Sequence, residues 1–452
     1  MLTSSFVYIN NIIFEVNISQ TYNIHKLCDF FVLIKYQKGR MRSMNLEQIK
    51  IREFGPIKKC DIEIRDFTIL IGEQSSGKST VAKSIFLFQE IKANLQKQLS
   101  WRAACSEATW LPAKQMFIEG VKKCLLEVFG EERIYANTDL YMEYNYAEDV
   151  SVKIYLETSL ESNCQILVEI SNRLAELLKL CDQEQMISDT QGIKEKTDHL
   201  FTDNVESIYI PSERGIVTLL GNQLVQCKRQ LPNDQKEIGG CLSRFIDQVS
   251  VMRIFFSDHK AVRSTEGNLV RYAKLVNEVL HGEYQNKDGE ETIRINDDQY
   301  VPIAYASSGQ KEALWILNTI RYCFENHKKM YLIIEEPESY LFPEEQKLLT
   351  ECISMVRNSG SKVLLMTHSP YVLGTLNNLL YASKLSEKIG KEQIEKIIDS
   401  EKWIKGEEFV SYHIKDGIAN QCIDVDSGQI QNEQIDTASD EINEEYDRMI
   451  LL

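Results

Sequence analysis

The sequence has little proline, a deficit of positive charge and no long apolar run. Only 8 of 452 residues are proline, which argues against a proline-rich linker protein. The 51 basic residues are outnumbered by 67 acidic ones, and the net charge of -16 argues against a surface that coats nucleic acid, although a local basic groove remains compatible with it. No apolar run approaches the roughly 20 residues that a membrane-spanning helix needs, so we expect no membrane contact.

The cysteines do not have the spacing of a metal site. There are 11 of them, an odd number, without a Cys-x-x-Cys pair or a histidine spacing typical of zinc. The start of the chain does not have the pattern of a secretory signal. We therefore expect reduced thiols in a cytoplasmic protein.

The overall composition is that of a globular protein. Hydrophobic residues make up 43% and charged residues 26%, which excludes a disordered chain, a collagen or a coiled-coil rod as a description of the whole. The length allows two or three domain-sized units, or one large domain that carries an insertion.

The order of the patterns predicts an α/β fold with a parallel sheet. A β-hairpin turning at Gly55-Pro56 is followed by a buried strand at 67–71 and a helix at about 78–97. Further on, a helix at 309–326, a strand at 330–335, a helix at 344–358, a strand at 362–367 and another helix follow one another over short connections. A hairpin is also expected around residues 287–289.

Composition and pattern divide the chain into five segments. Residues 1–43 look unlike the rest and are interpreted as an N-terminal extension, the alternative being an ordered strand and helix. Residues 44–100 and 206–385 are expected to form the two parts of a core. Residues 101–205 are expected to be a mainly helical insert, with short strands near 140–144 and 150–154 and a helix over 166–180. Residues 386–452 are expected to hold a hairpin turning at Asp416-Gly417 and a terminal amphipathic helix.

The strongest motif begins at Gly72 and matches the phosphate-binding loop pattern in full. A buried strand precedes it and a helix follows, which favours this interpretation over a chance match in a surface loop. Backbone N–H groups and the helix N-terminus would face the phosphates, Lys78 would reach the β and γ phosphates, and the Ser79 hydroxyl would coordinate Mg²⁺. The predicted nucleotide-binding residues are Gly72, Glu73, Gln74, Ser75, Ser76, Gly77, Lys78, Ser79 and Thr80.

A second motif is an apolar strand that ends in two acids. In Tyr331–Glu338, Glu335 would hold the Mg²⁺ shell and Glu336 would polarise the attacking water. On its own, a strand followed by Glu-Glu-Pro is better explained as a solvated helix cap. Together with the phosphate loop, it favours a catalytic interpretation.

Two shorter phrases complete the set. Ser307, Ser308, Gly309 and Gln310 open a helix and would form an anion site, although the same residues are an ordinary helix cap. His368 follows a strand in Met366–Pro370, where its imidazole could contact the γ-phosphate or the attacking water. A lone histidine there would more often be structural, but the ordered set favours a catalytic one.

The order of these motifs resembles the ABC-type ATPase heads, the P-loop NTPases whose sheet has an antiparallel N-terminal part. The closer likeness is to the branch with the OLD (overcoming lysogenization defect) nucleases, PtuA of the Septu system and AriA of the PARIS system. It rests on the phrases Ile334–Glu338, Thr367–Tyr371 and Tyr209–Arg214, and covers about residues 44–385. The chain departs from the family at Tyr340-Leu341-Phe342-Pro343, where His-Leu-His-Pro is frequent, and this puts the cross-dimer contacts of that loop in doubt.

The resemblance implies an ATP-switched, head-to-head homodimer. Ser308 and Gly309 of one subunit would close on ATP held by the loop of the other. Glu213 and Arg214 would lie near the nucleotide or the dimer interface, the alternative being a surface ion pair. The implied setting is bacterial anti-phage defence, in which this ATPase senses or scaffolds and a separate nuclease cuts.

A nuclease within the same chain is not expected. OLD nucleases carry a C-terminal metal-dependent domain, whereas here only Asp424-Val425-Asp426 has a suitable spacing, and an ordinary turn explains it. Three other functions stay open. They are a repair or chromosome-maintenance ATPase of RecF or SMC type that binds duplex DNA, a transporter ATPase, and a scaffold that binds ATP without hydrolysing it.

Overall fold

The computed structural model describes most of the chain from Glu47 onward. The described residues are 47–104, 111–158, 164–182, 197, 200–201, 205–220, 240–258, 267–287, 289–424, 427–431 and 437–450. The expectation of an extension over residues 1–43 lies outside them. By compactness the chain divides between Leu46 and Glu47, and all described residues belong to the second unit.

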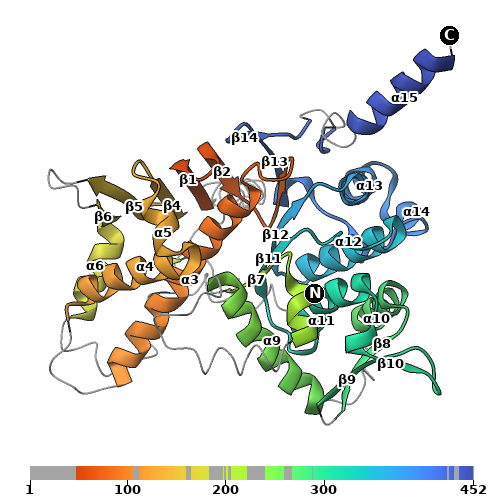
Figure 1. Ribbon diagram of the computed structural model, residues 1–452, viewed down its shortest axis with the longest axis horizontal. Coiled ribbons are helices and arrows are strands. Elements are labelled where there is room, and N and C mark those ends of the chain that lie inside the picture. Colours follow the sequence, from red (N-terminus) through yellow and green to blue (C-terminus); the bar gives the residue numbers. More distant parts are fainter. Residues whose placement is uncertain are drawn as a thin grey trace, which may run out of the picture. The chain divides into compact units, whose positions relative to one another are not determined.

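One large mixed sheet organises this unit (Figure 1). Within the described residues its order is β6-β5-β4-β1-β2-β14-β13-β3-β12-β11-β7. Its strands are β1 (Glu47–Phe54), β2 (Ile57–Ile64), β3 (Phe67–Ile71), β4 (Tyr141–Ala147), β5 (Val150–Thr158), β6 (Cys164–Ile170), β7 (Glu206–Ile210), β11 (Met330–Glu335), β12 (Lys362–Thr367), β13 (Phe409–Lys415) and β14 (Ile418–Gln421).

The direction of the strands changes across the sheet. Neighbours from β13 through β3, β12 and β11 to β7 are all parallel. On the other side of the sheet, each strand runs antiparallel to its neighbour, in the order β2, β1, β4, β5 and β6. This confirms the expected α/β fold with a mixed sheet and an antiparallel N-terminal part.

Helices cover both faces of the parallel strands, with α3 on one face and α11, α12 and α13 on the other. The side chains of β11 alternate between two hydrophobic cores, one on each face of the sheet. Tyr331 and Ile333 pack in the core on the α3 side, and Leu332 and Ile334 pack in the core on the side of α11, α12 and α13. The helices are α3 (Lys78–Ala104), α4 (Ala113–Phe129), α5 (Glu131–Tyr135), α6 (Asn172–Cys181), α9 (Gly240–Asp258), α10 (Gly267–Leu280), α11 (Ser308–Glu325), α12 (Pro343–Asn358), α13 (Pro370–Ile389), α14 (Lys391–Glu395) and α15 (Thr437–Ile450). Short 3-10 helices lie at η3 (Ile303–Tyr305), η4 (Ser400–Lys402) and η5 (Gly406–Glu408).

A second, small sheet confirms the hairpin expected near residue 288. It consists of β8 (Glu283–Lys287), β9 (Glu290–Arg294) and β10 (Tyr300–Pro302). None of the helices in the described ranges is long and apolar enough to cross a membrane.

Two expectations need correction. The helix expected over 166–180 is wrong in its first third, because Cys164–Ile170 is strand β6, paired with β5, and the helix begins only at Asn172. The segment expected as a mainly helical insert thus adds three strands, β4 to β6, to the main sheet. The expected hairpin at Asp416-Gly417 is confirmed, but it is no appendage, since β13 pairs with β3 inside that sheet.

Candidate functional site

The phosphate loop is wedged between two hairpin turns. A Cβ on Gly72 would lie 2.5 Å from the carbonyl oxygen of Ile414 in β13, and one on Gly77 would lie 2.4 Å from Ile57 Cδ1 beside the first turn. Gly77 also has a φ of 110°, which favours glycine. Glycine is therefore needed at Gly72 because the backbone of β13 leaves no space for a side chain, and it is needed at Gly77 because of the positive φ.

The two turns are also joined to each other. The carbonyl oxygen of Gly417 accepts hydrogen bonds from the backbone N–H groups of Lys58 and Lys59, at 2.9 and 3.0 Å. The C-terminal hairpin thus braces the loop that the sequence predicts to bind phosphates.

Lys78 turns back onto the loop. Its Nζ donates to the carbonyl oxygens of Gly72 at 2.6 Å and Glu73 at 2.7 Å. Burial lowers the pKa of Lys78, and the carboxylates of Glu336, Glu338, Glu335 and Glu73 oppose that shift. The lysine charge is therefore held within the field of the acids that end β11.

Three neighbouring parallel strands bring the predicted catalytic residues together. β12 pairs with β3 on one side and with β11 on the other. Their carboxyl ends carry the phosphate loop, His368 and the pair Glu335 and Glu336. Ligands commonly bind outside the carboxyl ends of such strands.

Glu335 is held rigidly. Its carboxylate accepts hydrogen bonds from the Tyr209 hydroxyl at 2.6 Å and from the Ser212 backbone N–H at 3.1 Å. The residue is 4% exposed, and burial raises the pKa of Tyr209 well above its usual value, with Glu335 adding to the shift. Tyr209 therefore acts as a donor to this carboxylate.

Glu336 is the more open of the two acids. Its side chain is 35% exposed, its φ is 40°, and its Oε1 lies 3.9 Å from His368 Nδ1. A glutamate in this left-handed conformation is uncommon, and strain of this kind is concentrated at functional sites. Its backbone N–H donates to the carbonyl oxygen of Met366, so β12 helps to hold it.

Arg214 lies beneath the acids and is fully buried. Its guanidinium donates to the carbonyl oxygens of Pro211, Glu312, Glu335 and Glu336, at 2.8 to 3.0 Å. The expectation that it lies near the nucleotide or an interface stays a prediction, and the structure shows that it supports the backbone of both acids. Its neighbour Glu213 is exposed.

Glu338 is a third acid of the motif, and the sequence alone indicates no role for it. It is 6% exposed, its Oε1 accepts hydrogen bonds from β12, and its Oε2 has no hydrogen-bond partner within the described ranges. The signal available in the sequence was a third acid placed after Pro337.

Ser307 and Gln310 form a capping box at the N-terminus of α11. Ser307 Oγ accepts from the Gln310 N–H at 3.2 Å, and Gln310 Oε1 accepts from the Ser307 N–H at 2.9 Å. Ser308 is exposed. A Cβ on Gly309 would lie 2.7 Å from the carbonyl oxygen of Tyr340, so this glycine allows close packing within the chain.

The loop that departs from the family is exposed at both of its aromatic residues. Tyr340 and Phe342 are 78% and 71% exposed, and Tyr340 has a φ of 59°. These aromatic side chains therefore form an exposed surface beside Gly309.

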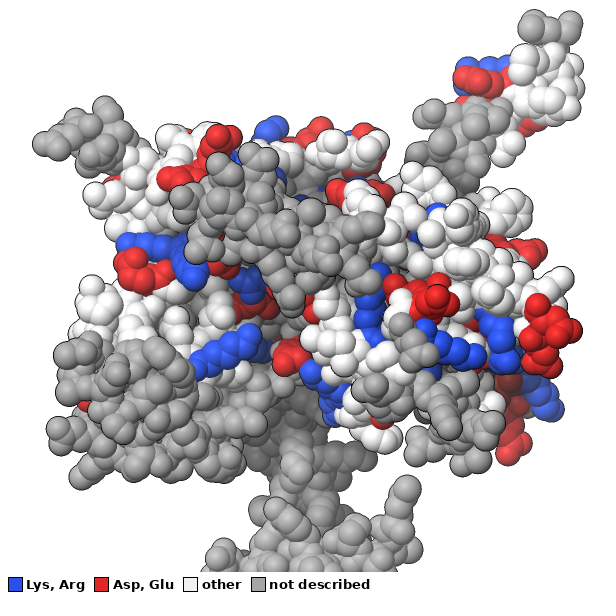
Figure 2. All heavy atoms as spheres, turned by 60° about the horizontal axis from the view of Figure 1, so that its bottom comes forward, with Lys and Arg blue, Asp and Glu red and all other residues white. Residues whose placement is uncertain are grey.

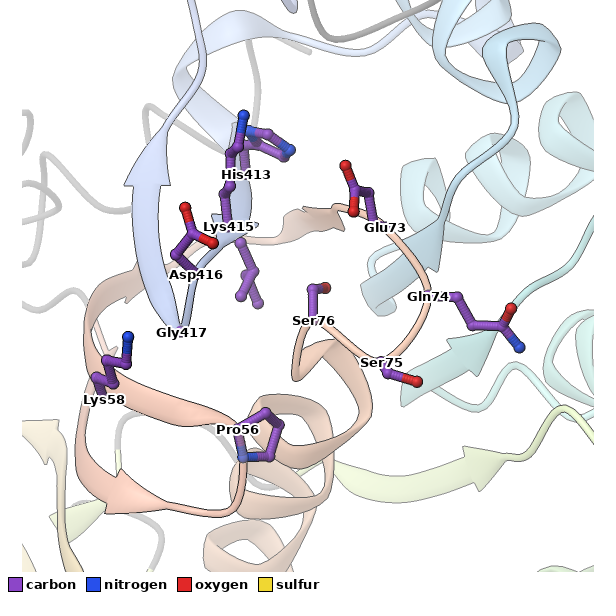
Figure 3. Close-up of a pocket in the computed structure, with 11 residues that line it drawn as sticks. Pro56, Lys58, Glu73, Gln74, Ser75, Ser76, His413, Lys415, Asp416 and Gly417 are labelled. Atoms are coloured by element: carbon purple, nitrogen blue, oxygen red, sulfur yellow. The ribbon is translucent and has the colours of Figure 1, made fainter. Parts of the chain in front are cut away.

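A cavity of about 350 Å³ lies between the phosphate loop and the C-terminal hairpin. Figure 3 shows Glu73, Ser75 and Ser76 on one side of it and His413 and Asp416 on the other. Lys58 and Lys415 also line it. Burial lowers the pKa of His413, and Lys415 adds to that shift, while Glu73 opposes it.

The residues present fit a nucleotide with Mg²⁺. Ser76 Oγ, in the phosphate loop, and Glu338 Oε2 are both buried, and within the described residues neither has a hydrogen-bond partner. The exposed Ser79 opens α3, whose N-terminus favours anions. Thr80 is less suited, since it is buried and its hydroxyl accepts from Arg133 Nη2 at 2.9 Å.

Asp424, the described acid of the Asp-x-Asp spacing in the tail, takes part in a turn. Asp424 Oδ1 accepts from the backbone N–H of Ser427 at 2.6 Å, and Asp426 lies outside the described residues. Among the side chains that the structure describes, no cluster of three or more potential ligands suits a metal ion by protein groups alone.

A family model described as "AAA ATPase domain" matches residues 44–253 and 228–373. No curated protein matches the sequence. The structure is similar to an SMC head bound to the C-winged helix domain of ScpA, with 11% identity, 83% of this chain and 96% of that chain covered, and a TM-score of 0.39.

Two other solved structures show a similar degree of likeness. The SMC head domain from Thermotoga maritima has 11% identity, a TM-score of 0.35, and covers 84% of this chain and 98% of that one. An ATP-binding cassette of an ABC transporter in its ADP conformation has 12% identity, a TM-score of 0.32, and covers 88% of this chain and 98% of that one.

Proposed function

The chain belongs to the family of AAA ATPase domains, and from this premise we propose that it binds ATP with Mg²⁺ at the phosphate loop and hydrolyses it. One observation supports this above all others: Lys78, the two acids and His368 meet at the carboxyl ends of three adjacent parallel strands. Phosphoryl transfer needs positioned charge more than covalent chemistry, and this arrangement supplies it.

Each residue has a part that follows from its place. Lys78 would leave the loop carbonyls to bind phosphate oxygens, and the Ser79 hydroxyl and Glu335 would hold the Mg²⁺ shell. Mg²⁺ neutralises charge on the phosphates when it is bound. Glu336, open to solvent and 3.9 Å from His368, orients and polarises the attacking water.

The test is Glu336→Gln. The variant is expected to bind ATP like the parent and to hydrolyse it about 10²- to 10⁴-fold more slowly, the usual cost of losing a group that activates water. Glu344→Gln, on the exposed first turn of α12, is the matched control and should keep the parent rate. Turnover at the parent rate in Glu336→Gln would remove Glu336 from the mechanism. ATP binding without turnover in the parent would favour the non-hydrolysing scaffold.

We further propose that the nucleoside end of ATP lies in the cavity beside the loop. Its volume of about 350 Å³ falls in the range of small-molecule sites, and its mostly polar lining suits a polar ligand. Combined replacement of His413 and Lys415 by alanine should weaken ATP binding about tenfold and leave inorganic tripolyphosphate binding unchanged. Equal loss for both ligands would contradict this placement.

The proposed working form is an ATP-switched homodimer. Its support is the exposed Ser308 at the N-terminus of α11, where partial positive charge and a small side chain allow close approach to a phosphate. In a dimer, that phosphate belongs to ATP held by the second copy. Light scattering with ATP in the Glu336→Gln background measures the assembly.

The proposed setting is bacterial anti-phage defence with a separate nuclease subunit. Its support is the resemblance of Ile334–Glu338 and Thr367–Tyr371 to the OLD-like branch. Asp424 takes part in a turn, so the purified chain is expected to leave DNA intact with Mg²⁺ or Mn²⁺. Metal-dependent cleavage that Asp424→Ala abolishes would contradict this, and a nuclease gene next to this one would support it.

The distribution of charge on the face drawn in Figure 2 gives little support for direct binding of nucleic acid. On the face drawn in Figure 2, the Lys and Arg side chains of the described residues are interleaved with Asp and Glu. Ion pairs also hold several basic side chains of the described residues, for example Lys50 with Glu143 and Arg253 with Glu291, both at 3.0 Å. A gel-shift titration at low salt would reveal a binding groove if one exists, and would favour the repair or chromosome-maintenance alternative.

A further inference from the structure

Glu338 lies two residues beyond Glu336, in the turn that follows β11, and its side chain is 6% exposed. A carboxylate buried to this degree is costly unless hydrogen bonds compensate it. Its contacts therefore indicate what it holds in place.

One carboxylate oxygen holds the end of the neighbouring strand. Glu338 Oε1 accepts a hydrogen bond from the Thr367 hydroxyl at 2.7 Å and another from the His368 backbone N–H at 3.0 Å. The Ser369 N–H in turn donates to Thr367 Oγ1 at 3.0 Å. These bonds fix the stretch of backbone that carries the His368 side chain.

The imidazole of His368 stands beside this carboxylate. Its Nδ1 lies 3.5 Å from Glu338 Oε1 and 3.9 Å from Glu336 Oε1, and the side chain is 57% exposed. Both distances exceed a hydrogen bond, but the exposed ring can close them by a small rotation. Glu338 Oε2 is buried without a hydrogen-bond partner in the described ranges, so the carboxylate has acceptor capacity to spare.

We propose that Glu338 is a positioning residue that holds the Nδ1 side of His368, so that Nε2 is the nitrogen presented to the γ-phosphate or the attacking water. The hydrogen bond at one ring nitrogen decides what the other can do. An ionised carboxylate only accepts, so it selects the ring form that carries hydrogen on Nδ1. The inference rests on the proposed ATPase function.

The test is Glu338→Gln, which changes little besides one oxygen. The amide oxygen can keep the Oε1 bonds from the Thr367 hydroxyl and the His368 N–H, but the negative charge beside Nδ1 is lost and an NH₂ group that donates takes the place of Oε2. We expect kcat to fall about 10- to 100-fold while KM and the Kd for ATP stay within about twofold of the parent values. Glu344→Gln is the matched control and should change neither constant.

A double-mutant cycle shows whether the effect passes through the histidine. If it does, the variant with both Glu338→Gln and His368→Ala turns over as slowly as His368→Ala alone. Losses that multiply in the double variant, or a parental kcat in Glu338→Gln, would overturn the inference. Should Glu338→Gln not fold, Thr367→Val removes one donor at nearly constant shape and is expected to lower kcat in the same way.

Different results would refute the proposed ATPase function and the proposed role of Glu338. A parent chain without ATPase activity refutes the proposed function and this inference with it. An active parent that slows in Glu336→Gln but not in Glu338→Gln leaves the proposed function intact and refutes only the role of Glu338.

Discussion

Arg214 Nη1 donates a 2.8 Å hydrogen bond to the backbone carbonyl oxygen of Glu335. The same guanidinium reaches the carbonyl oxygen of Glu336 at 2.9 Å, and its Nε lies 3.3 Å from Glu312 Oε2 in α11. One fully buried side chain thus ties both acids to the helix that Ser308 opens. The acids and this helix are therefore expected to move together.

The first prediction concerns this clamp, the set of hydrogen bonds by which buried Arg214 holds the backbone of Glu335 and Glu336. Arg214→Lys should lower the free energy of unfolding by about 3 kcal/mol, because an ammonium cannot reproduce the planar set of charged hydrogen bonds. Denaturant unfolding measures it. Arg271→Lys is the control, since Arg271 is largely exposed in its pair with Asp399, and it should cost about 0–1 kcal/mol. Equal losses in the two variants would contradict the clamp.

The second prediction concerns the phosphate loop. Lys78→Ala should weaken ATP binding about 10²-fold or more, because two charge-assisted hydrogen bonds to phosphate are each worth about 1.5–3 kcal/mol. The fold should survive, since Lys78 bonds only to carbonyl oxygens of the loop itself. Lys83→Ala, one turn further along α3, is the control. Unchanged affinity for ATP in Lys78→Ala would overturn the assignment of the loop.

Much of the core could be predicted because its signals are local. The strand before Gly72 and the strands that end at Glu335 and Thr367 are short, continuous apolar runs, which is typical of buried parallel strands. The helix follows directly after the glycine-rich loop. Parallel strands place their carboxyl ends at one edge, so the grouping of Lys78, the acids and His368 followed from the order of elements.

The remainder depended on contacts between distant segments. The short apolar run at 164–170 fits either period, and its pairing with β5 makes it a strand. The hairpin at 409–421 shows its turn in the sequence, but no local signal shows that β13 lies beside β3. The burial of Arg214 and the contacts of Glu338 also join residues far apart in sequence, so neither role could be read from the motif.

The third prediction concerns stability at high pH. Burial raises the pKa of Cys60, Cys241 and Cys323 from 9.0 to about 12. These thiols stay protonated in the folded chain but ionise above pH 9 once it unfolds. Their contribution to stability is therefore complete below about pH 9 and is lost as the pH rises towards 12.

Urea titrations at pH 8, 9.5 and 10.5 check this prediction. Above pH 9 each thiol should lower the free energy of unfolding by about 1.4 kcal/mol per pH unit. In Cys60→Ala, the free energy of unfolding should fall by about 1.4 kcal/mol per pH unit less than in the parent, because one thiol is missing. A free energy of unfolding that stays level from pH 8 to pH 10.5 would contradict the effect.

The last prediction tests the composite site. Ser308→Arg should preserve ATP binding by the single chain and prevent ATP-dependent assembly in the Glu336→Gln background. The reason is steric: the exposed N-terminus of α11 must approach a phosphate held by another copy, and an arginine adds bulk there even though its charge partly compensates. Gln115→Arg adds the same side chain to the exposed face of α4 and should assemble like the parent. Light scattering with ATP compares the two. If Ser308→Arg assembles as Gln115→Arg does, the site lies within one subunit, or the dimer has another geometry in which this helix end does not meet the nucleotide.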